Sequence, residues 1–402
     1  MKLTKSLLVA AFAFTTIANA QEEKPSFSLA GEFRPRTEWF GHGQSATAVN
    51  GSEGYVSTSV RAALKATYTT ETYTTYLSFQ EVFKFGDRTQ ISPAGNGNLR
   101  VQEAWADVKL SNPLSLKIGR QTLSYDDQRI LGGLGWAQQA RTHDAALFKY
   151  NKEGYKLDIG FALNTATSAQ YPTAALFSYR DMAFVHASKK YGNTLFSALV
   201  LNNSYQAGTE NKSNLTTAGL HIETKVGPIG LSANGYIQDG YRVGDIPVKM
   251  AYLASLDASM KATEKLSLGL GSEIISGKTD DSAAFFPLYG TNHAFNGLMD
   301  RFYVGNYANA GGLLDIHISA TAKLPGGYAL TGKFLNFSEV EDLNNDGDKA
   351  QGNELDLVLA KGFKGFKVVG GYSQFFEPDS VVGAKDTQNW AWLMLIITPK
   401  FL

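Results

Sequence analysis

The sequence has no cysteine, no apolar run of membrane-helix length after residue 20, and no excess of charge of one sign. Without cysteine, the chain has neither a disulfide framework nor thiolate chemistry. A membrane helix needs roughly 20 consecutive apolar residues, so no helical anchor is expected after Ala20. Beyond that residue, 35 basic and 37 acidic residues leave a net charge of about −2. Because nucleic-acid binding requires a basic surface, no nucleic-acid partner is expected.

The first 20 residues have the features of a secretory signal peptide. Lys2 and Lys5 form a positive region, residues 7–14 an apolar core, and Ala18-Asn19-Ala20 a small-residue cleavage site. We expect residues 1–20 to be cleaved and residues 21–402 to form the mature, exported protein. Two classes then remain open, a soluble periplasmic protein and an outer-membrane β-barrel.

Glycine and aromatic residues are abundant, with 40 Gly, 24 Phe and 19 Tyr, which is typical of tight turns and aromatic-rich strands. Residues 56–68 alternate strictly, with Leu64 on one face and Arg61 and Lys65 on the other, and residues 313–324 repeat the pattern. Such alternation predicts a strand with a different solvent on each side. Segments of about 10 or more residues are long enough to cross a bilayer as tilted strands.

The connections between these segments fall into two classes, short turns and long polar loops. Eight short turns are predicted at 70–71, 111–113, 151–154, 191–193, 227–228, 263–264, 325–327 and 362–365. Nine long loops are predicted at 41–54, 85–98, 126–142, 165–180, 203–213, 241–249, 278–312, 340–352 and 377–387. Seventeen connections join 18 strands, and both chain ends then lie on the short-turn side.

An even strand count with short turns on one side is the outer-membrane architecture. The predicted fold class is therefore all-β, a single transmembrane antiparallel β-barrel of 18 strands with short periplasmic turns and long extracellular loops. The alternative is a soluble β-sandwich, but a chain of this length would then divide into two or three domains, and no linker is visible. A barrel of this size is too wide for side chains alone to fill, so its lumen holds water, inward-folded loops, or both.

Charged residues are predicted to line this lumen. With Phe33 and Trp39 toward lipid, the intervening charged residues of the first strand point inward. The predicted substrate-path residues are Arg34, Arg36, Arg61, Lys65, Arg100, Arg120, Arg129, Arg141, Glu32 and Glu38. Guanidinium groups pair bidentately with carboxylates, so these side chains could form a stepping path for an anionic or hydroxyl-rich solute. Alternatively, they pair with acidic residues as a neutral internal network, and both interpretations remain open.

One stretch carries a family resemblance. Gly119-Arg120-Gln121-Thr122-Leu123-Ser124-Tyr125, followed by Arg129, Trp136 and Asp144-Ala145, resembles the alginate-export family of outer-membrane porins. Pro287-Leu288-Tyr289-Gly290 is similar to the long-loop signature of that family. The resemblance implies an 18-stranded barrel, in agreement with the independent count. It also implies outward passage of a polyuronate through an arginine-lined pore in the type member.

Two loops suggest sites of their own. Asp342, Asn344, Asp346 and Asp348 place oxygen ligands at alternate positions, which suits an external calcium ion, although a solvated acidic turn is the alternative. No other cofactor is expected. The longest predicted loop, 278–312, contains His293, Asp300 and Arg301. It either folds into the lumen and narrows it or caps the extracellular face.

Catalytic residues are not predicted. No serine motif lies beside His143 or His317, and Asp126 and Asp127 would point to opposite sides of a strand. The sequence therefore predicts a passive outer-membrane channel of a Gram-negative bacterium, not an enzyme. It would pass polar, anionic or oligosaccharide solutes as a monomer among outer-membrane lipids. The alternative is a plugged or structural barrel whose loops bind a partner and pass no solute.

Overall fold

The structure is a computed structural model that describes residues 24–41, 54–87, 99–164, 178–207, 211–302, 311–342, 347–378 and 388–402. The predicted signal peptide lies outside these residues. The strands are β1 Ser26–Phe40, β2 Tyr55–Thr69, β3 Tyr73–Lys84, β4 Arg100–Ser111, β5 Leu114–Gln121, β6 His143–Lys152, β7 Tyr155–Leu163, β8 Asp181–Tyr191, β9 Thr194–Ala207, β10 Asn211–Val226, β11 Ile229–Arg242, β12 Ile246–Lys261, β13 Leu266–Ser276, β14 Gly312–Leu324, β15 Tyr328–Ser338, β16 Ala350–Phe363, β17 Phe366–Phe376 and β18 Gln388–Ile397. Two short 3-10 helices, η1 Asn292–Ala294 and η2 Pro325–Gly327, complete the elements.

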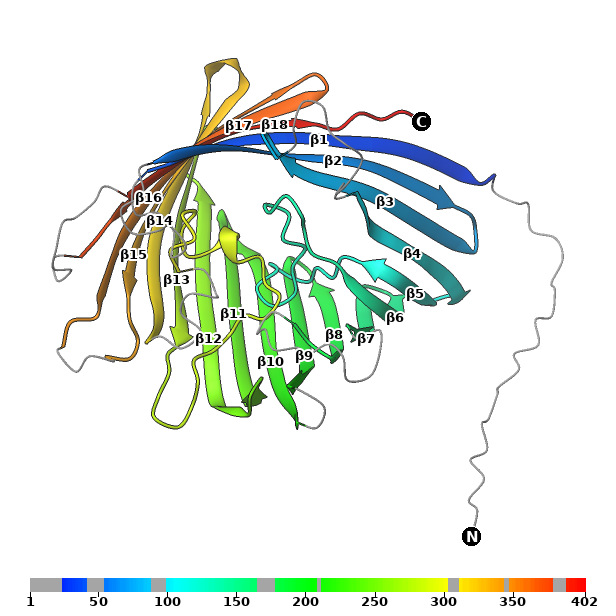
Figure 1. Ribbon diagram of the computed structural model, residues 1–402, viewed down its shortest axis with the longest axis horizontal. Helices are drawn as coiled ribbons and strands as arrows, with labels where there is room; N and C mark the ends of the chain where they lie inside the picture. The colour runs from blue at the N-terminus through cyan, green and yellow to red at the C-terminus, as the bar shows by residue number, and fades with distance from the viewer. Residues whose placement is uncertain are drawn as a thin grey trace, which may run out of the picture.

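The 18 strands form one closed antiparallel barrel, as predicted (Figure 1). Each strand pairs with the next along the chain, and β1 pairs with β18 to close the sheet. Closure leaves no sheet edge to face lipid, which satisfies the backbone hydrogen bonds within the bilayer. In the described part of the chain, no helix is long and apolar enough to cross a membrane.

All eight predicted short turns are confirmed, but two of the nine predicted long loops are wrong. β9 runs to Ala207 and β10 begins at Asn211, and β11 runs to Arg242 and β12 begins at Ile246. The run of polar residues near residue 203 suggested a loop, because such runs are typical of loops. In the structure those side chains are satisfied instead: Asn203 faces inward and is fully buried, and Asn202 donates a hydrogen bond to Asn214 on the next strand.

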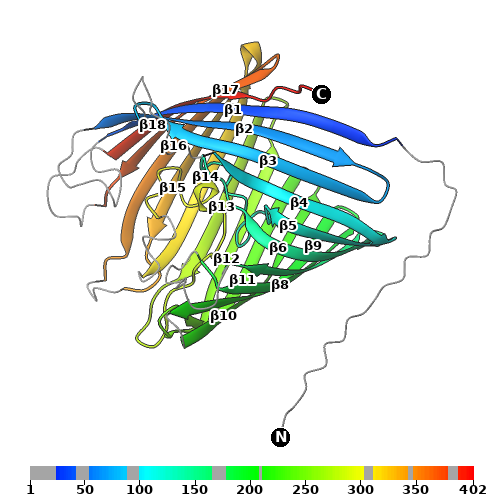
Figure 2. The ribbon, with the colours of Figure 1, turned by 45° about the vertical axis from the view of Figure 1, so that its right-hand side comes forward.

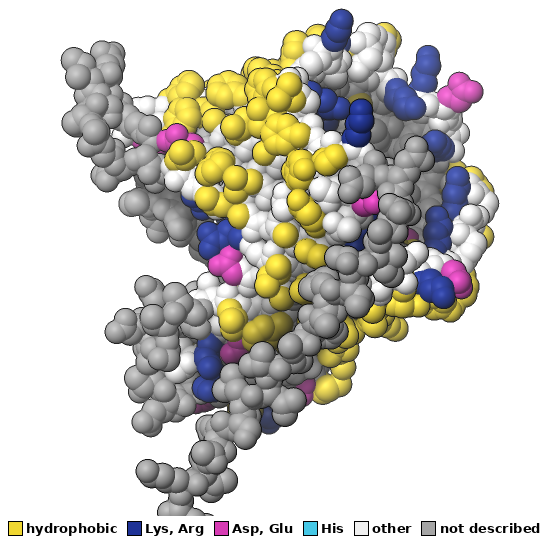
Figure 3. Space-filling view, turned by 90° about the vertical axis from the view of Figure 1, so that its right-hand side faces the viewer, with side chains coloured by type: hydrophobic (Ala, Val, Ile, Leu, Met, Phe, Trp, Pro, Cys, Tyr) yellow, Lys and Arg dark blue, Asp and Glu magenta, His cyan; other side chains and the backbone are white. Residues whose placement is uncertain are grey.

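The barrel is apolar on its outer face and carries buried polar and charged side chains, beside apolar ones, on its inner face. Each of the 18 strands exposes at least one large apolar side chain, such as Phe33, Leu64 and Ile118. Arg34 and Arg61, on the inward face of neighbouring strands, are buried. Figure 3 shows apolar side chains gathered over the outer face, with lysine and arginine side chains toward its margin. This distribution follows from period-two alternation between lipid and a polar interior.

An aromatic belt lies on the outer face at the short-turn end. The hydroxyls of Tyr155 and Tyr191 are 3.1 Å apart, and the rings of Phe363 and Phe366 stack with their centroids 4.6 Å apart. The Lys189 ammonium lies 3.4 Å from the Tyr155 ring centroid. Such amphipathic rings are enriched where a barrel meets the membrane interface.

The chain continues beyond its last strand, β18, which ends at Ile397. Residues 398–402 continue along β1, where the Gly31 amide donates to the carbonyl of Pro399 at 2.9 Å and the Phe401 amide donates to that of Leu29 at 2.8 Å. The chain end is therefore held by backbone hydrogen bonds beyond the strand proper.

Candidate functional site: a lumen narrowed by two inner loops

Two connections fold into the barrel, where both ribbon views show them inside the ring of strands (Figures 1 and 2). We call residues 122–142, between β5 and β6, inner loop A. We call residues 277–302, between β13 and β14, inner loop B. The inward position of the longest predicted loop is thus established for its described part. The site is the portion of the lumen that these two loops narrow.

Three of the predicted lumen arginines hold inner loop A against β1 and β2. Arg34 donates to the Gly135 carbonyl at 2.8 Å and to the Gln138 side chain at 3.0 Å. Arg61 donates to the carbonyls of Gln138 and Ala137, both at 2.6 Å. Arg36 donates to the Trp136 carbonyl at 2.9 Å, and its guanidinium lies 4.2 Å from the ring centroid. These cations therefore satisfy backbone carbonyls of a loop that has no strand partner there.

The predicted acidic residues of β1 complete this network. Glu32 pairs with Lys65 at 2.6 Å and with Arg61 at 3.2 Å, and Glu38 pairs with Arg36 at 3.0 Å. The structure thus brings together six of the ten predicted path residues. Their arrangement matches the internal network that the sequence left open, and their part in a solute path stays a prediction.

Arg100, Arg129 and Arg141, also predicted to line the lumen, connect inner loop A to other strands and to inner loop B. Arg100 on β4 donates to the Gln139 carbonyl at 2.8 Å. Arg129 forms an ion pair of 2.6 Å with Glu273 on β13, across the lumen, and both side chains are about 95% buried. Arg141 donates to the Gly290 carbonyl of inner loop B at 3.3 Å. Inner loop A therefore crosses the lumen from β1–β4 to β13.

The lumen placement predicted for Arg120 is wrong. Arg120 shares a face of β5 with Ile118, which is 52% exposed on the outside, whereas its neighbour Gln121 is buried inside. It forms a bidentate pair with Asp144 on β6, at 2.7 and 2.8 Å. The alternation of β5 decides the face, and a motif resemblance alone does not give the phase of that alternation.

Inner loops A and B pair with each other at the centre. Leu131 and Tyr289 form a parallel β-bridge, in which the Tyr289 amide donates to the Ile130 carbonyl at 3.0 Å. The Thr291 amide donates to the Gln128 carbonyl at 2.9 Å. Two segments about 160 residues apart in sequence thus supply each other's missing backbone partners.

Inner loop B also packs into a hydrophobic core inside the barrel. Phe285, Phe286 and Leu288 are fully buried against apolar inward residues of the surrounding strands. The Gln238 side chain of β11 brackets Phe286, accepting its amide hydrogen at 2.9 Å and donating to its carbonyl at 2.7 Å. Apolar side chains on the inner face of several strands therefore pack against this loop and do not face lipid.

An aromatic cluster closes one side of the narrowed lumen. The Trp136 ring stacks on His293 of inner loop B at 4.4 Å and meets Trp392 edge-on at 4.7 Å and Trp390 at 5.9 Å. His293 in turn pairs with Asp300 at 2.9 Å. Trp390 and Trp392 were not among the predicted lumen residues. Trp390 and Trp392 are two residues apart and therefore share one face of the strand, whereas Leu393 faces lipid. This alternation was the signal that could have placed both tryptophans in the lumen.

A second group that sequence reasoning missed lies on the β3–β6 wall. The rings of Tyr76 and Trp105 stack at 5.3 Å, and the Lys117 ammonium lies 3.8 Å from the Trp105 centroid. Lys149 pairs with Asp107 at 2.7 Å. These side chains line the lumen between inner loop A and the short turns, and they present cations, a carboxylate and aromatic faces to a passing solute.

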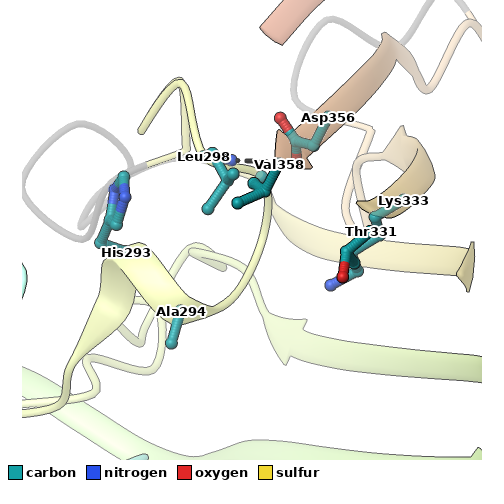
Figure 4. Close-up of a pocket in the computed structure, with 8 residues that line it drawn as sticks. His293, Ala294, Leu298, Thr331, Lys333, Asp356 and Val358 are labelled. Atoms are coloured by element: carbon teal, nitrogen blue, oxygen red, sulfur yellow. Dashed lines mark hydrogen bonds between the residues drawn. The ribbon is translucent and has the colours of Figure 1, made fainter. Parts of the chain in front are cut away.

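A cavity of about 270 Å³ remains between inner loop B and the β15–β16 wall. It is lined by His293, Ala294, Gly297, Leu298, Thr331, Lys333, Asp356 and Val358 (Figure 4). Asp356 accepts the Leu298 amide at 3.3 Å, which fixes the loop above the wall. Lys333 forms no ion pair with any residue the structure describes, so its ammonium is available to a solute.

Two of the four proposed calcium ligands are described. Asp342 accepts the Gly347 amide at 2.9 Å, and Asp348 accepts the Ala350 amide at 3.0 Å, so both carboxylates act in local turns. Asn344 and Asp346 lie outside the described residues. Among those that are described, no group of three potential metal ligands is found.

Acidification is expected to loosen inner loop A through Asp126. Burial raises the pKa of this carboxyl, but hydrogen bonds from His186 and Ser197 outweigh it and leave the pKa below its ordinary value. A depressed pKa means that docking is favoured above the unfolded value of about 4 and is lost as pH falls through the lower folded value. Cleavage of the loop by pepsin should therefore increase below about pH 4. In Asp126→Asn cleavage should be higher and less dependent on pH; an unchanged profile would contradict this role.

The comparisons with known proteins agree with this geometry. OccK9 (OpdG) of Pseudomonas aeruginosa is similar with a TM-score of 0.67 and 13% identity, covering 93% of this chain and 98% of that one. OccAB4 of Acinetobacter baumannii gives 0.65 and 12%, covering 95% and 99%. OpdK of Pseudomonas aeruginosa, solved with vanillate, gives 0.63 and 12%, covering 93% and 99%. Likenesses at this identity show the fold. A comparison with curated proteins found no significant match.

A closed 18-stranded barrel with an apolar outer face and a lumen narrowed by inner loops has the architecture of a passive outer-membrane channel. The family model described as alginate export matches residues 26–392. The chain therefore belongs to the alginate export family, as the resemblance in its sequence implied.

Proposed function

We propose that this channel passes small polar solutes that carry a carboxylate or several hydroxyl groups. The observation that carries the proposal is the chemistry left accessible beside the inner loops: the Lys333 ammonium, which has no ion pair among the described residues, in a cavity of about 270 Å³, and the Lys117–Trp105 pair on the opposite wall. Ammonium groups bind carboxylates, and a few polar groups on an otherwise closed wall select by shape. The family description names alginate, and OpdK was solved with vanillate; both compounds carry a carboxylate.

The proposal includes no catalytic step and no partner protein. Apolar side chains exposed on all 18 strands support a monomer surrounded by lipid. The two inner loops favour small solutes over a thick polymer because they bridge the lumen from β1–β4 to β13 and β16. The same loops favour the alternative, a plugged barrel that passes nothing, if they leave no continuous water path.

Liposome swelling distinguishes the two functions. Liposomes containing the purified protein should swell in monosaccharides and small carboxylates and should exclude longer oligosaccharides, with protein-free liposomes as the control. Replacing Arg34, Arg36 and Arg61 together by alanine removes the donors that hold inner loop A, so the size limit should rise. An unchanged size limit with a lower ratio of carboxylate to neutral uptake would instead show that these arginines form the solute path. Folded protein that admits no solute would establish the plugged barrel.

A further inference from the structure

Charge is distributed unevenly at the short-turn end of the barrel. We define the vestibule lysines as Lys156, Lys190, Lys225, Lys261, Lys323 and Lys367, on β7, β8, β10, β12, β14 and β17. Each lies at the end of its strand or one residue from it. At this end of the barrel, the two outermost residues of every strand include no aspartate and no glutamate. Along the right-hand margin of Figure 3, basic side chains are more abundant than acidic ones.

Strand alternation places the vestibule lysines on the inner face. Lys225 lies on the face of β10 that contains fully buried His221, whereas Leu220 and Val226 on the other face are about 60% exposed. Lys323 lies on the face of β14 that contains buried Asp315. The other four lysines are likewise an even number of residues from buried inward side chains of their strands.

The charges of the vestibule lysines are not neutralised locally. None of the six has a carboxylate within 4.0 Å in the part of the chain that the structure describes. The nearest inward carboxylates along these strands are Asp158 and Glu223. A mouth lined by one sign of charge over low-dielectric walls focuses the field and concentrates counter-ions. By contrast, the arginines beneath inner loop A are occupied by its carbonyls.

We propose that the vestibule lysines form an anion-concentrating ring at the periplasmic mouth, and that this ring, rather than the arginine cluster, gives the channel its anion preference. The inference rests on the proposed function and names the determinant of selectivity. Multivalent anions such as a tricarboxylate are concentrated most strongly, because several ammonium groups on different strands attract one molecule. The ring lies on the periplasmic side, so anions in the periplasm meet it before the loops narrow the lumen.

A charge-matched pair of variants tests the proposal. Lys190→Gln/Lys225→Gln/Lys261→Gln removes three inward charges. The control, Lys152→Gln/Lys189→Gln/Lys361→Gln, removes three charges from the same end on the outer face, where Lys189 and Lys361 lie over belt aromatics. Single-channel reversal potentials under a potassium chloride gradient should show a loss of anion preference in the inward variant and none in the control. The difference should fade near 1 M salt, where the Debye length is about 3 Å.

Citrate binding to the folded protein in detergent, measured by calorimetry, provides a readout that does not depend on conduction. Weaker binding in the inward variant than in the control supports the ring. Equal reversal potentials in the two variants, or equal citrate binding, would overturn it while leaving the channel function intact. A folded wild-type protein that conducts no ions but binds citrate through the inward lysines would overturn the proposed function and retain the ring.

Discussion

Replacing residues 283–301 of inner loop B by a short glycine-serine linker is expected to raise the single-channel conductance several-fold. These residues occupy the lumen: Phe285 and Phe286 fill its inner core, and the Met299 amide donates to Glu354 on β16 at 2.8 Å. A barrel of 16–18 strands leaves an aqueous channel when loops do not fill it. Removing the loop therefore exchanges protein for water along the conduction path.

Planar bilayer recordings on wild type and the linker variant measure this effect. Phe286→Ala serves as an intermediate variant, because truncating a buried phenylalanine typically costs about 3–5 kcal/mol and should loosen the loop without deleting it. Its recordings should show larger current fluctuations at a similar mean conductance. A linker variant that folds as a barrel and conducts like wild type would mean that inner loop B does not limit the path.

Breaking the Arg129–Glu273 ion pair is expected to have the largest effect of any single arginine substitution on stability. Both side chains are about 95% buried, and Glu273 also accepts a hydrogen bond from Asn296 of inner loop B at 2.9 Å. Arg129→Ala leaves a buried carboxylate without its cation, which typically costs about 3–5 kcal/mol. Arg129→Ala/Glu273→Gln should recover part of the loss, because the charge is removed together with its partner.

Arg120→Ala is the matched control for this measurement. Arg120 makes a pair with Asp144 of equally good geometry, but the two side chains are 48% and 53% exposed. Exposed pairs contribute about 0–1 kcal/mol, so the free energy of unfolding in urea should barely change. Equal losses in Arg129→Ala and Arg120→Ala would show that burial does not set the contribution of the ion pair.

Much of the barrel could be predicted from the sequence because its strands face two different solvents. Alternation such as that over residues 56–68 and 313–324, together with the short-turn residues, was sufficient to predict the number of strands and the face of each strand that contacts the membrane. The exceptions are instructive. Asn203 lies in a polar run that suggested a loop, yet it is buried in β9, because its polar partners come from other parts of the chain. Local composition does not reveal a partner that is distant in sequence.

The sequence by itself determined the strand count, the side on which the short turns lie and the inward face of Arg34, Arg36 and Arg61, since all three follow from local periodicity. Only the tertiary structure decided that these arginines hold inner loop A, that Arg129 reaches Glu273 across the lumen, and that Trp136 meets Trp390 and Trp392. Those contacts join residues more than 70 positions apart. They depend on the closure of the barrel, which brings its first and last strands together around loops whose path no local pattern encodes.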